Sequence, residues 1–139
     1  MNHSRSFGIR IFIFTIMLAT SLYSAELDWL HEYDKALEQA KKERKDVYLF
    51  IGADTCKFCK RFSDITLSNA DVMKRLRKDY VLLYMSRDQH KIPKKFITKG
   101  VPRHYFLTPD GTISFDSWGV LEVAGFNLLL DEAELNREK

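Results

Sequence analysis

The stretch VYLFIGADTCKFC, residues 47–59, places a pair of cysteines directly after an apolar run. Its first five residues are continuously apolar, with β-branched and aromatic members, which predicts a buried strand. A short loop follows, and we expect a helix to begin at Cys56. The two cysteines of the chain, Cys56 and Cys59, therefore stand where a strand passes into a helix.

This placement favours redox chemistry. A helix N-terminus carries unpaired N–H groups and a partial positive charge, which stabilise a thiolate, the reactive form of cysteine. Cys56 is predicted to be the nucleophile, and Cys59, one turn further on, the resolving thiol that breaks a mixed disulfide. Lys57 and Lys60 are expected to lower the pKa of Cys56 further. Thr55 and Phe58 complete the expected active-site environment.

Three other interpretations of the cysteine pair are less favoured. A purely stabilising disulfide is disfavoured because so short a loop gains little from closure. Two buried free thiols are disfavoured because Asp54, Thr55 and Lys57 flank them. A metal site would need two further ligands, and the histidines that could supply them lie in separate segments without ligand spacing: His31, His90 and His104. We expect no metal and no organic cofactor.

The N-terminus has the layout of a secretory signal peptide. Arg5 and Arg10 precede 15 uncharged residues, 11–25, which are too few for a membrane span of roughly 20 apolar residues. We expect a signal peptide over residues 1–25 and one domain over residues 26–139; cleavage one residue earlier and an uncleaved anchor are the alternatives. Export to an oxidising compartment would make a cysteine pair a candidate for redox cycling.

Composition limits the function. The 139 residues suit one domain, and 45% hydrophobic residues suit a globular one. The net charge of +3 includes Arg5 and Arg10, so the chain without residues 1–25 carries 20 basic and 19 acidic side chains. A nearly neutral domain disfavours nucleic-acid binding as the main function.

The remaining pattern predicts a mixed sheet between helices. A strand, a helical segment and a second strand call for a parallel crossover, and a later hairpin calls for an antiparallel edge. We therefore expect an α/β fold with a mixed central sheet flanked by helices on both faces. The expected helices are 28–44 capped by Asp28, one from Cys56, one capped by Ser68 and Asn69, 93–99, and one through 126–133; the expected strands are 47–51, 80–85, 103–108 and 112–115.

Across residues 28–135 the chain resembles the thioredoxin-fold superfamily, and more narrowly its small exported members. The matching pieces are Trp29, ALEQAKKE at 36–43, VYLFI at 47–51, ADTCKFCK at 53–60, GVP at 100–102 and FLTPDG at 106–111. The resemblance implies a thioredoxin-like fold and a periplasmic thiol–disulfide oxidoreductase. It also implies that Pro102 is a cis-proline facing the disulfide, and that Val101 offers main-chain hydrogen bonds to an extended substrate.

The resemblance favours a reductase of disulfides in partner proteins. A membrane-bound thiol reductase is the implied electron donor, and a monomer is expected. The chain departs from thioredoxins at Thr55, where Trp is common, and at Phe50, where a buried acid assists proton transfer. A disulfide oxidase or isomerase of the same fold, and a non-enzymatic peptide-binding or chaperone-like module, are therefore kept as alternatives.

The sequence also predicts the surroundings of four further residues. His104 and Arg103 follow Pro102, and a place at the rim of the active site and a solvated or edge-strand place are equally expected for them. Trp29 and Trp118 are expected in the core, since large aromatic side chains supply most of its bulk.

Overall fold

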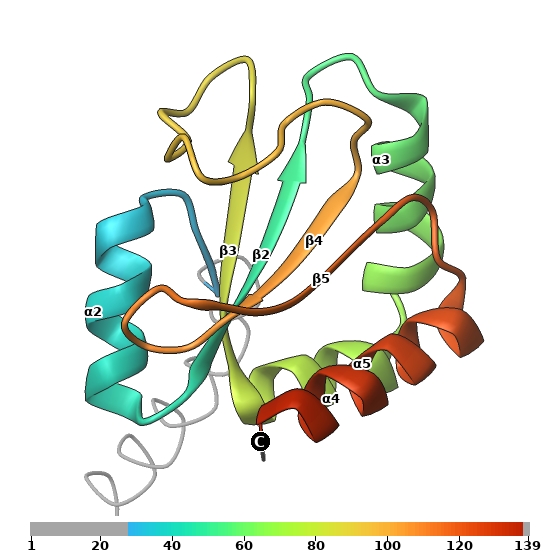
Figure 1. Ribbon diagram of the computed structural model, residues 1–139. Helices are drawn as coiled ribbons and strands as arrows, with labels where there is room; N and C mark the ends of the chain where they lie inside the picture. The colour runs from blue at the N-terminus through green and yellow to red at the C-terminus, as the bar shows by residue number, and fades with distance from the viewer. Residues whose placement is uncertain (1–27, 138–139) are drawn as a thin grey trace, which may run out of the picture.

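The computed structural model describes residues 28–137 and contains a five-stranded mixed sheet in the order β1-β3-β2-β4-β5 (Figure 1). β1 and β2 run parallel to β3, while β4 is antiparallel to β2 and to β5. This confirms the predicted α/β class. The strands are β1 Trp29–Leu30, β2 Asp46–Gly52, β3 Tyr80–Ser86, β4 Arg103–Leu107 and β5 Ile113–Trp118.

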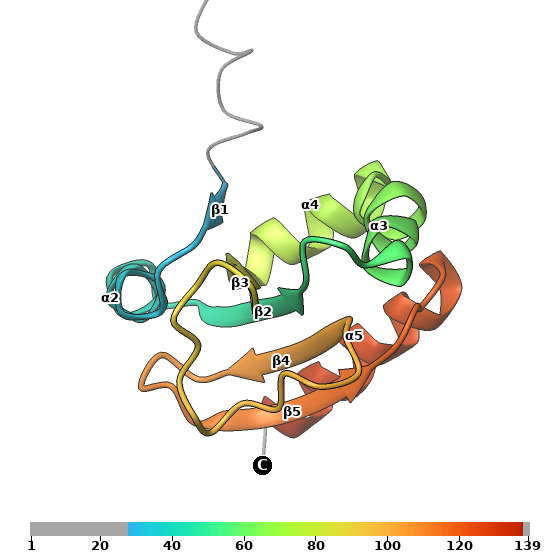
Figure 2. The same cartoon turned by 90° about the horizontal axis from the view of Figure 1, so that it is seen from above.

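Helices cover both faces of the sheet, as expected (Figure 2). α2, Tyr33–Glu43, packs on one face, and α3, Lys57–Phe62, α4, Ala70–Asp79, and α5, Val123–Arg137, pack on the other. All seven residues of β2 are buried because both of its faces are covered. Successive side chains of β2 alternate between the two cores, so Tyr48 and Phe50 face α3 while Leu49 faces α2.

The first predicted helix is shorter than expected. Trp29 and Leu30 form an edge strand, in register with Leu82 and Leu83 of β3, and α2 begins only at Tyr33. Asp28 does not cap this helix; its carboxylate lies 2.5 Å from the Nε atom of Arg77. The start of the helix was misplaced because pairing with a strand some 50 residues away leaves no local periodicity.

The prediction of a helix at residues 93–99 is wrong. The segment consists of turns held by contacts with distant residues, among them a hydrogen bond of 3.0 Å from the backbone N–H of Ile97 to the hydroxyl of Tyr105. Phe96 is buried, and its ring lies 4.9 Å from that of Tyr105. Tertiary packing therefore overrides a helical pattern of only seven residues.

The region between α3 and α4 contains an irregularity that periodicity did not indicate. A π-helical turn, η1, Ser63–Leu67, continues α3. The predicted cap of α4 is confirmed at Asn69, whose Oδ1 accepts hydrogen bonds of 3.1 Å from the backbone N–H groups of Asp71 and Val72.

The predicted signal peptide, residues 1–25, lies outside the described residues. Among residues 28–137, none of the helices has both the length and the apolar character that a membrane span requires.

Candidate active site

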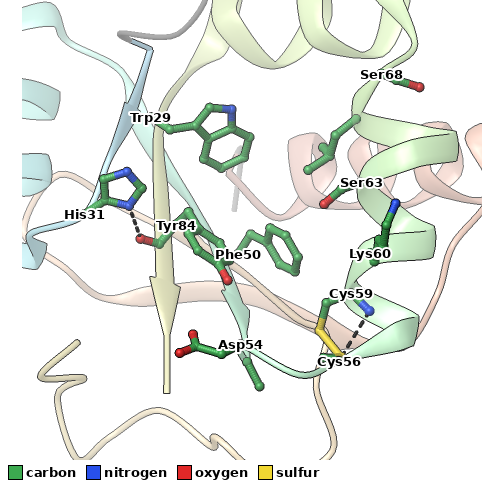
Figure 3. A pocket seen from close by; sticks show the side chains of 12 residues that line it. Trp29, His31, Phe50, Asp54, Cys56, Cys59, Lys60, Ser63, Ser68 and Tyr84 are labelled. Atoms are coloured by element: carbon green, nitrogen blue, oxygen red, sulfur yellow. Dashed lines mark hydrogen bonds between the residues drawn. A yellow bond between two sulfur atoms is a disulfide. The ribbon is translucent and has the colours of Figure 1, made fainter. Parts of the chain in front are cut away.

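Cys56 and Cys59 lie at the carboxyl end of β2, where the chain leaves the sheet and enters α3 (Figure 3). The two residues are joined by a disulfide, with their Cα atoms 5.3 Å apart. Cys56 is the N-cap of α3, so the helix begins where the sequence predicts. Cys56 is partly exposed, whereas Cys59 is only 6% exposed. An approaching partner therefore meets Cys56 first.

The Sγ atom of Cys56 accepts a hydrogen bond of 3.1 Å from the backbone N–H of Cys59. The N-cap position directs the unpaired N–H groups of the first helical turn towards this sulfur. When the disulfide is reduced, the same donors would favour negative charge on Cys56 over negative charge on Cys59. The geometry thus separates the two sulfurs by exposure and by electrostatic environment.

The lysines beside the cysteines interact mainly with other groups. The Nζ atom of Lys57 lies over the ring of Phe58, 5.1 Å from its centroid. Lys60 forms an ion pair with Asp64 one turn further along the chain. Lys60 therefore adds less positive charge at the sulfur than its spacing from Cys56 suggests. Thr55 lies exposed in the loop before Cys56.

A groove of about 470 Å³ lies between α3 and the segments just before β4 and just after β5; neither cysteine lines it, but Val101 does. The Val101–Pro102 peptide bond is cis, and the carbonyl oxygen of Val101 lies 4.0 Å from the Sγ atom of Cys56. Phe58 and Trp118 line the groove and are 51% and 68% exposed. The expectation that Trp118 belongs to the core is wrong, because it ends β5 with its ring beside the groove and Arg103 against that ring.

His104 lies neither at the rim of the site nor in a solvated place; it is completely buried. Its Nε2 atom donates to the carbonyl oxygen of Gly119 at 2.9 Å, and its Nδ1 atom accepts from the hydroxyl of Tyr48 at 2.9 Å. Burial lowers the pKa of His104 from 6.5 to about 4, so the ring is neutral at pH 7. The backbone N–H of Gly119 in turn donates to the carbonyl oxygen of Pro102 at 2.9 Å. This chain of hydrogen bonds connects the core to the wall of the groove.

A larger pocket, of about 650 Å³, opens on the other side of the disulfide. It lies between the β1 side of the sheet on one wall and α3 with η1 on the other (Figure 3). Both cysteines line it, together with Trp29, His31, Phe50, Ala53, Asp54, Lys60, Ser63, Leu67, Ser68 and Tyr84. We refer to it below as the aromatic pocket. No local sequence pattern predicts this pocket, because its residues come from five elements and their loops, spread over positions 29–84.

Hydrogen bonds fix the loop before Cys56. The carboxylate of Asp54 accepts from the hydroxyl of Ser86 at 2.6 Å and from the side-chain amide of Gln89 at 2.9 Å, and these bonds lower the pKa of Asp54. The backbone N–H of Asp54 donates to Asp88 at 2.8 Å. The loop that presents Cys56 is thereby tied to the end of β3.

Comparisons with known proteins agree with this fold. Residues 28–109, more than half of the chain, match the family model described as thioredoxin-like. An uncharacterized protein of Archaeoglobus fulgidus is 29% identical over 79 residues; the match covers 55% of this chain and 62% of that protein, so the chain spans less than two thirds of this relative.

Two solved structures are similar in fold. A thioredoxin from Thermus thermophilus has a TM-score of 0.62 at 22% identity, covering 75% of this chain and 84% of that one. The oxidised C-terminal domain of DsbD from Neisseria meningitidis has a TM-score of 0.59 at 21% identity, covering 71% and 90%. These likenesses show the same fold, and the match over residues 28–109 shows that the chain belongs to the thioredoxin-like family.

Proposed function

We propose that this protein is an exported thiol–disulfide oxidoreductase that reduces disulfides in partner proteins. The observation that carries the proposal is the asymmetry of the cysteine pair: Cys56 is accessible at a helix N-terminus, and Cys59 is buried one turn behind it. Periplasmic localisation is part of the proposal and rests on the sequence pattern of residues 1–25.

The reaction consists of two thiol–disulfide exchanges. The thiolate of Cys56 attacks one sulfur of the partner's disulfide, a mixed disulfide forms, and the partner's other sulfur leaves as a thiolate. Cys59 then loses its proton and attacks the Sγ atom of Cys56. The partner's second sulfur leaves, so the partner is reduced by two electrons and the Cys56–Cys59 disulfide forms. A dithiol donor, which we propose to be a membrane-bound thiol reductase, returns the two electrons.

The groove beside Cys56 suits an extended segment of the partner. The main chain of Val101 lies next to the reactive sulfur and can pair with a peptide backbone, while Pro102 forms part of the same wall. The exposed rings of Phe58 and Trp118 line the same groove and offer apolar contact to that segment. We propose that Thr55, Lys57 and Lys60 only shape the polar environment of the Sγ atom of Cys56 and take no part in bond exchange.

Reduction of insulin by dithiothreitol tests the proposal, with turbidity as the readout. The wild type should accelerate the reaction. Cys56→Ser should lower the rate to that of dithiothreitol alone, because no nucleophile remains at the exposed position. Cys59→Ser should also lose turnover, but it should accumulate a mixed disulfide between Cys56 and insulin that mass spectrometry detects.

The two variants form a matched pair, since each keeps one of the two cysteines of the chain. Acceleration that survives Cys56→Ser would overturn the assignment of the nucleophile. A wild type that binds insulin without accelerating its reduction would instead indicate a non-enzymatic binding module.

A further inference from the structure

We propose that the aromatic pocket binds a second class of substrate, a low-molecular-weight disulfide with an uncharged aromatic body, which the thiolate of Cys56 reduces. The inference rests on the proposed redox function and adds a binding site to it. In this arrangement the groove beside Val101 receives extended segments of protein partners, and the aromatic pocket receives whole small molecules.

The reactive cysteine lies in the wall of the aromatic pocket. Cys56 lines the pocket and is partly exposed, whereas Cys59, which also lines it, is buried. Figure 3 shows the disulfide at one end of the helix wall, where the loop from β2 enters α3. A ligand between the two walls therefore meets Cys56 as the accessible sulfur, the same sulfur that attacks a protein partner.

The volume of the pocket suits a whole small molecule. Its value of about 650 Å³ falls within the range of roughly 300–1,000 Å³ that is typical of small-molecule sites. The pocket is also larger than the groove of about 470 Å³ that we assign to protein segments. It therefore has room for an aromatic ring together with the disulfide that the ring carries.

The sheet wall of the pocket is aromatic and already ordered. Three strands supply its rings: Trp29, Phe50 and Tyr84. The ring of Tyr84 lies 5.1 Å from that of Phe50, and a Cβ atom added at Gly52 would come within 3.0 Å of it. The ring of Trp29 packs against Tyr48 at 6.1 Å. Rings held in this way lose little freedom when a ligand binds, and aromatic pairs gain stability beyond the burial of their area.

The two oppositely charged side chains in the lining already have partners. Lys60 forms an ion pair with Asp64. The carboxylate of Asp54 accepts hydrogen bonds from the side chains of Ser86 and Gln89. A charged ligand would have to compete with these interactions to compensate for its lost hydration, whereas an uncharged ring needs no counter-ion. The lining thus favours an uncharged aromatic body.

The reaction uses the same two exchanges as the reduction of a protein partner. The thiolate of Cys56 forms a bond to one sulfur of the ligand, the S–S bond of the ligand breaks, and its other sulfur leaves as a thiolate. Cys59 then loses its proton to water and attacks the Sγ atom of Cys56, which expels the second sulfur of the ligand. Two electrons pass from the protein to the ligand, two thiols are released, and the Cys56–Cys59 disulfide forms. The proposed dithiol donor restores the reduced pair.

The two tryptophans of the chain report which site is occupied, because Trp29 lines the aromatic pocket and Trp118 lines the groove. The probe is benzyl methyl sulfide, an uncharged aromatic thioether that cannot exchange with a disulfide. Added to the oxidised, ¹⁵N-labelled full chain, it should shift the indole N–H signal of Trp29 much more than that of Trp118; Trp118→Phe assigns the two signals. No shift, or a shift of Trp118 as large as that of Trp29, would overturn the proposal.

Rates of reduction test the substrate class. The reduced full chain is mixed with benzyl 2-hydroxyethyl disulfide or with ethyl 2-hydroxyethyl disulfide, and the loss of protein thiols is followed. Reduction by dithiothreitol gives the intrinsic rate ratio of the two compounds. We expect the protein to favour the benzyl compound over this ratio by at least about tenfold, the gain of one or two aromatic contacts. The same ratio for the protein and for dithiothreitol would overturn the proposal.

A matched pair of variants assigns the preference to the pocket. Ser63 lies on the helix wall (Figure 3). Ser63→Leu fills the space and should abolish the preference for the benzyl compound, whereas Ser63→Ala should keep it. Both variants should reduce insulin at the wild-type rate, which separates failure of the pocket from failure of the redox function, where the wild type reduces neither insulin nor the small disulfides. A preference that survives in folded Ser63→Leu would contradict the proposal; if this variant does not fold, the indole signals of the wild type decide.

Discussion

Among single residues, His104 shows how a buried polar group can serve the site without touching a substrate. Phe50, Phe62 and Phe126 pack around its ring, and both ring nitrogens are hydrogen-bonded in the neutral form. Protonation would place a charge in this apolar core, and it would give Nδ1 a proton where it now accepts one from Tyr48. Protonation would leave the Nε2–H donor to the carbonyl of Gly119 in place, so the hydrogen bond that it would break is the one from Tyr48.

This arrangement predicts the pH dependence of stability. The pKa of His104 is about 4 in the folded protein against 6.5 in an ordinary histidine. Between these values the unfolded chain binds the extra proton, so the free energy of unfolding falls as the pH falls from 6.5 towards 4. The loss should approach roughly 3 kcal/mol. Urea denaturation across this range should show the loss in the wild type and a clearly smaller one in His104→Phe; parallel curves for the two proteins would contradict the assignment.

For single residues, the sequence predicted which side chains carry the redox chemistry, but it did not predict how each of them is buried. Cys56 and Cys59 could be predicted because a short motif fixes their place at the helix start. The burial of His104 could not, since a polar residue in a strand is usually solvated. Its partner Tyr48 lies on β2, 56 residues earlier, and the register that brings them together is a property of the assembled sheet.

Among the elements, α4 begins with a cap whose contribution can be measured. Asn69 satisfies two N–H groups that would otherwise lack partners at the helix start. Asn69→Ala should lower the free energy of unfolding by about 1 kcal/mol. Asn69→Asp keeps a side-chain acceptor at the N-cap, and it should change the free energy of unfolding by only a few tenths of a kcal/mol. The comparison uses urea denaturation at pH 7, and similar losses in both variants would show that the cap is not the cause.

Elements with strong local patterns were predictable, and those set by tertiary contacts were not. β2 and β3 are apolar runs between polar residues, and the cap of α4 is a local signal. β1 has only two residues and exists because it pairs with β3. The segment 93–99 has a helical pattern but is held as turns by Tyr105 and other distant groups.

For the whole molecule, the mixed sheet with helices on both faces could be predicted from the order of the elements, whereas the surroundings of the disulfide could not. A parallel crossover and a final hairpin suffice to predict a mixed sheet with helices on both faces. The groove and the aromatic pocket lie on opposite sides of the disulfide, and each combines residues from several elements. Their volumes depend on how helices pack on the sheet, which no local pattern encodes.

The reduction potential of the Cys56–Cys59 pair tests the central claim most directly, because it sets the direction in which electrons flow. It is obtained by equilibrating the protein with dithiothreitol or glutathione mixtures of known ratio and quantifying the free thiols. A reductase should have a potential near that of thioredoxin, roughly −270 mV. A potential near roughly −120 mV, the value of a strong disulfide donor, would contradict the account and identify the protein as an oxidant.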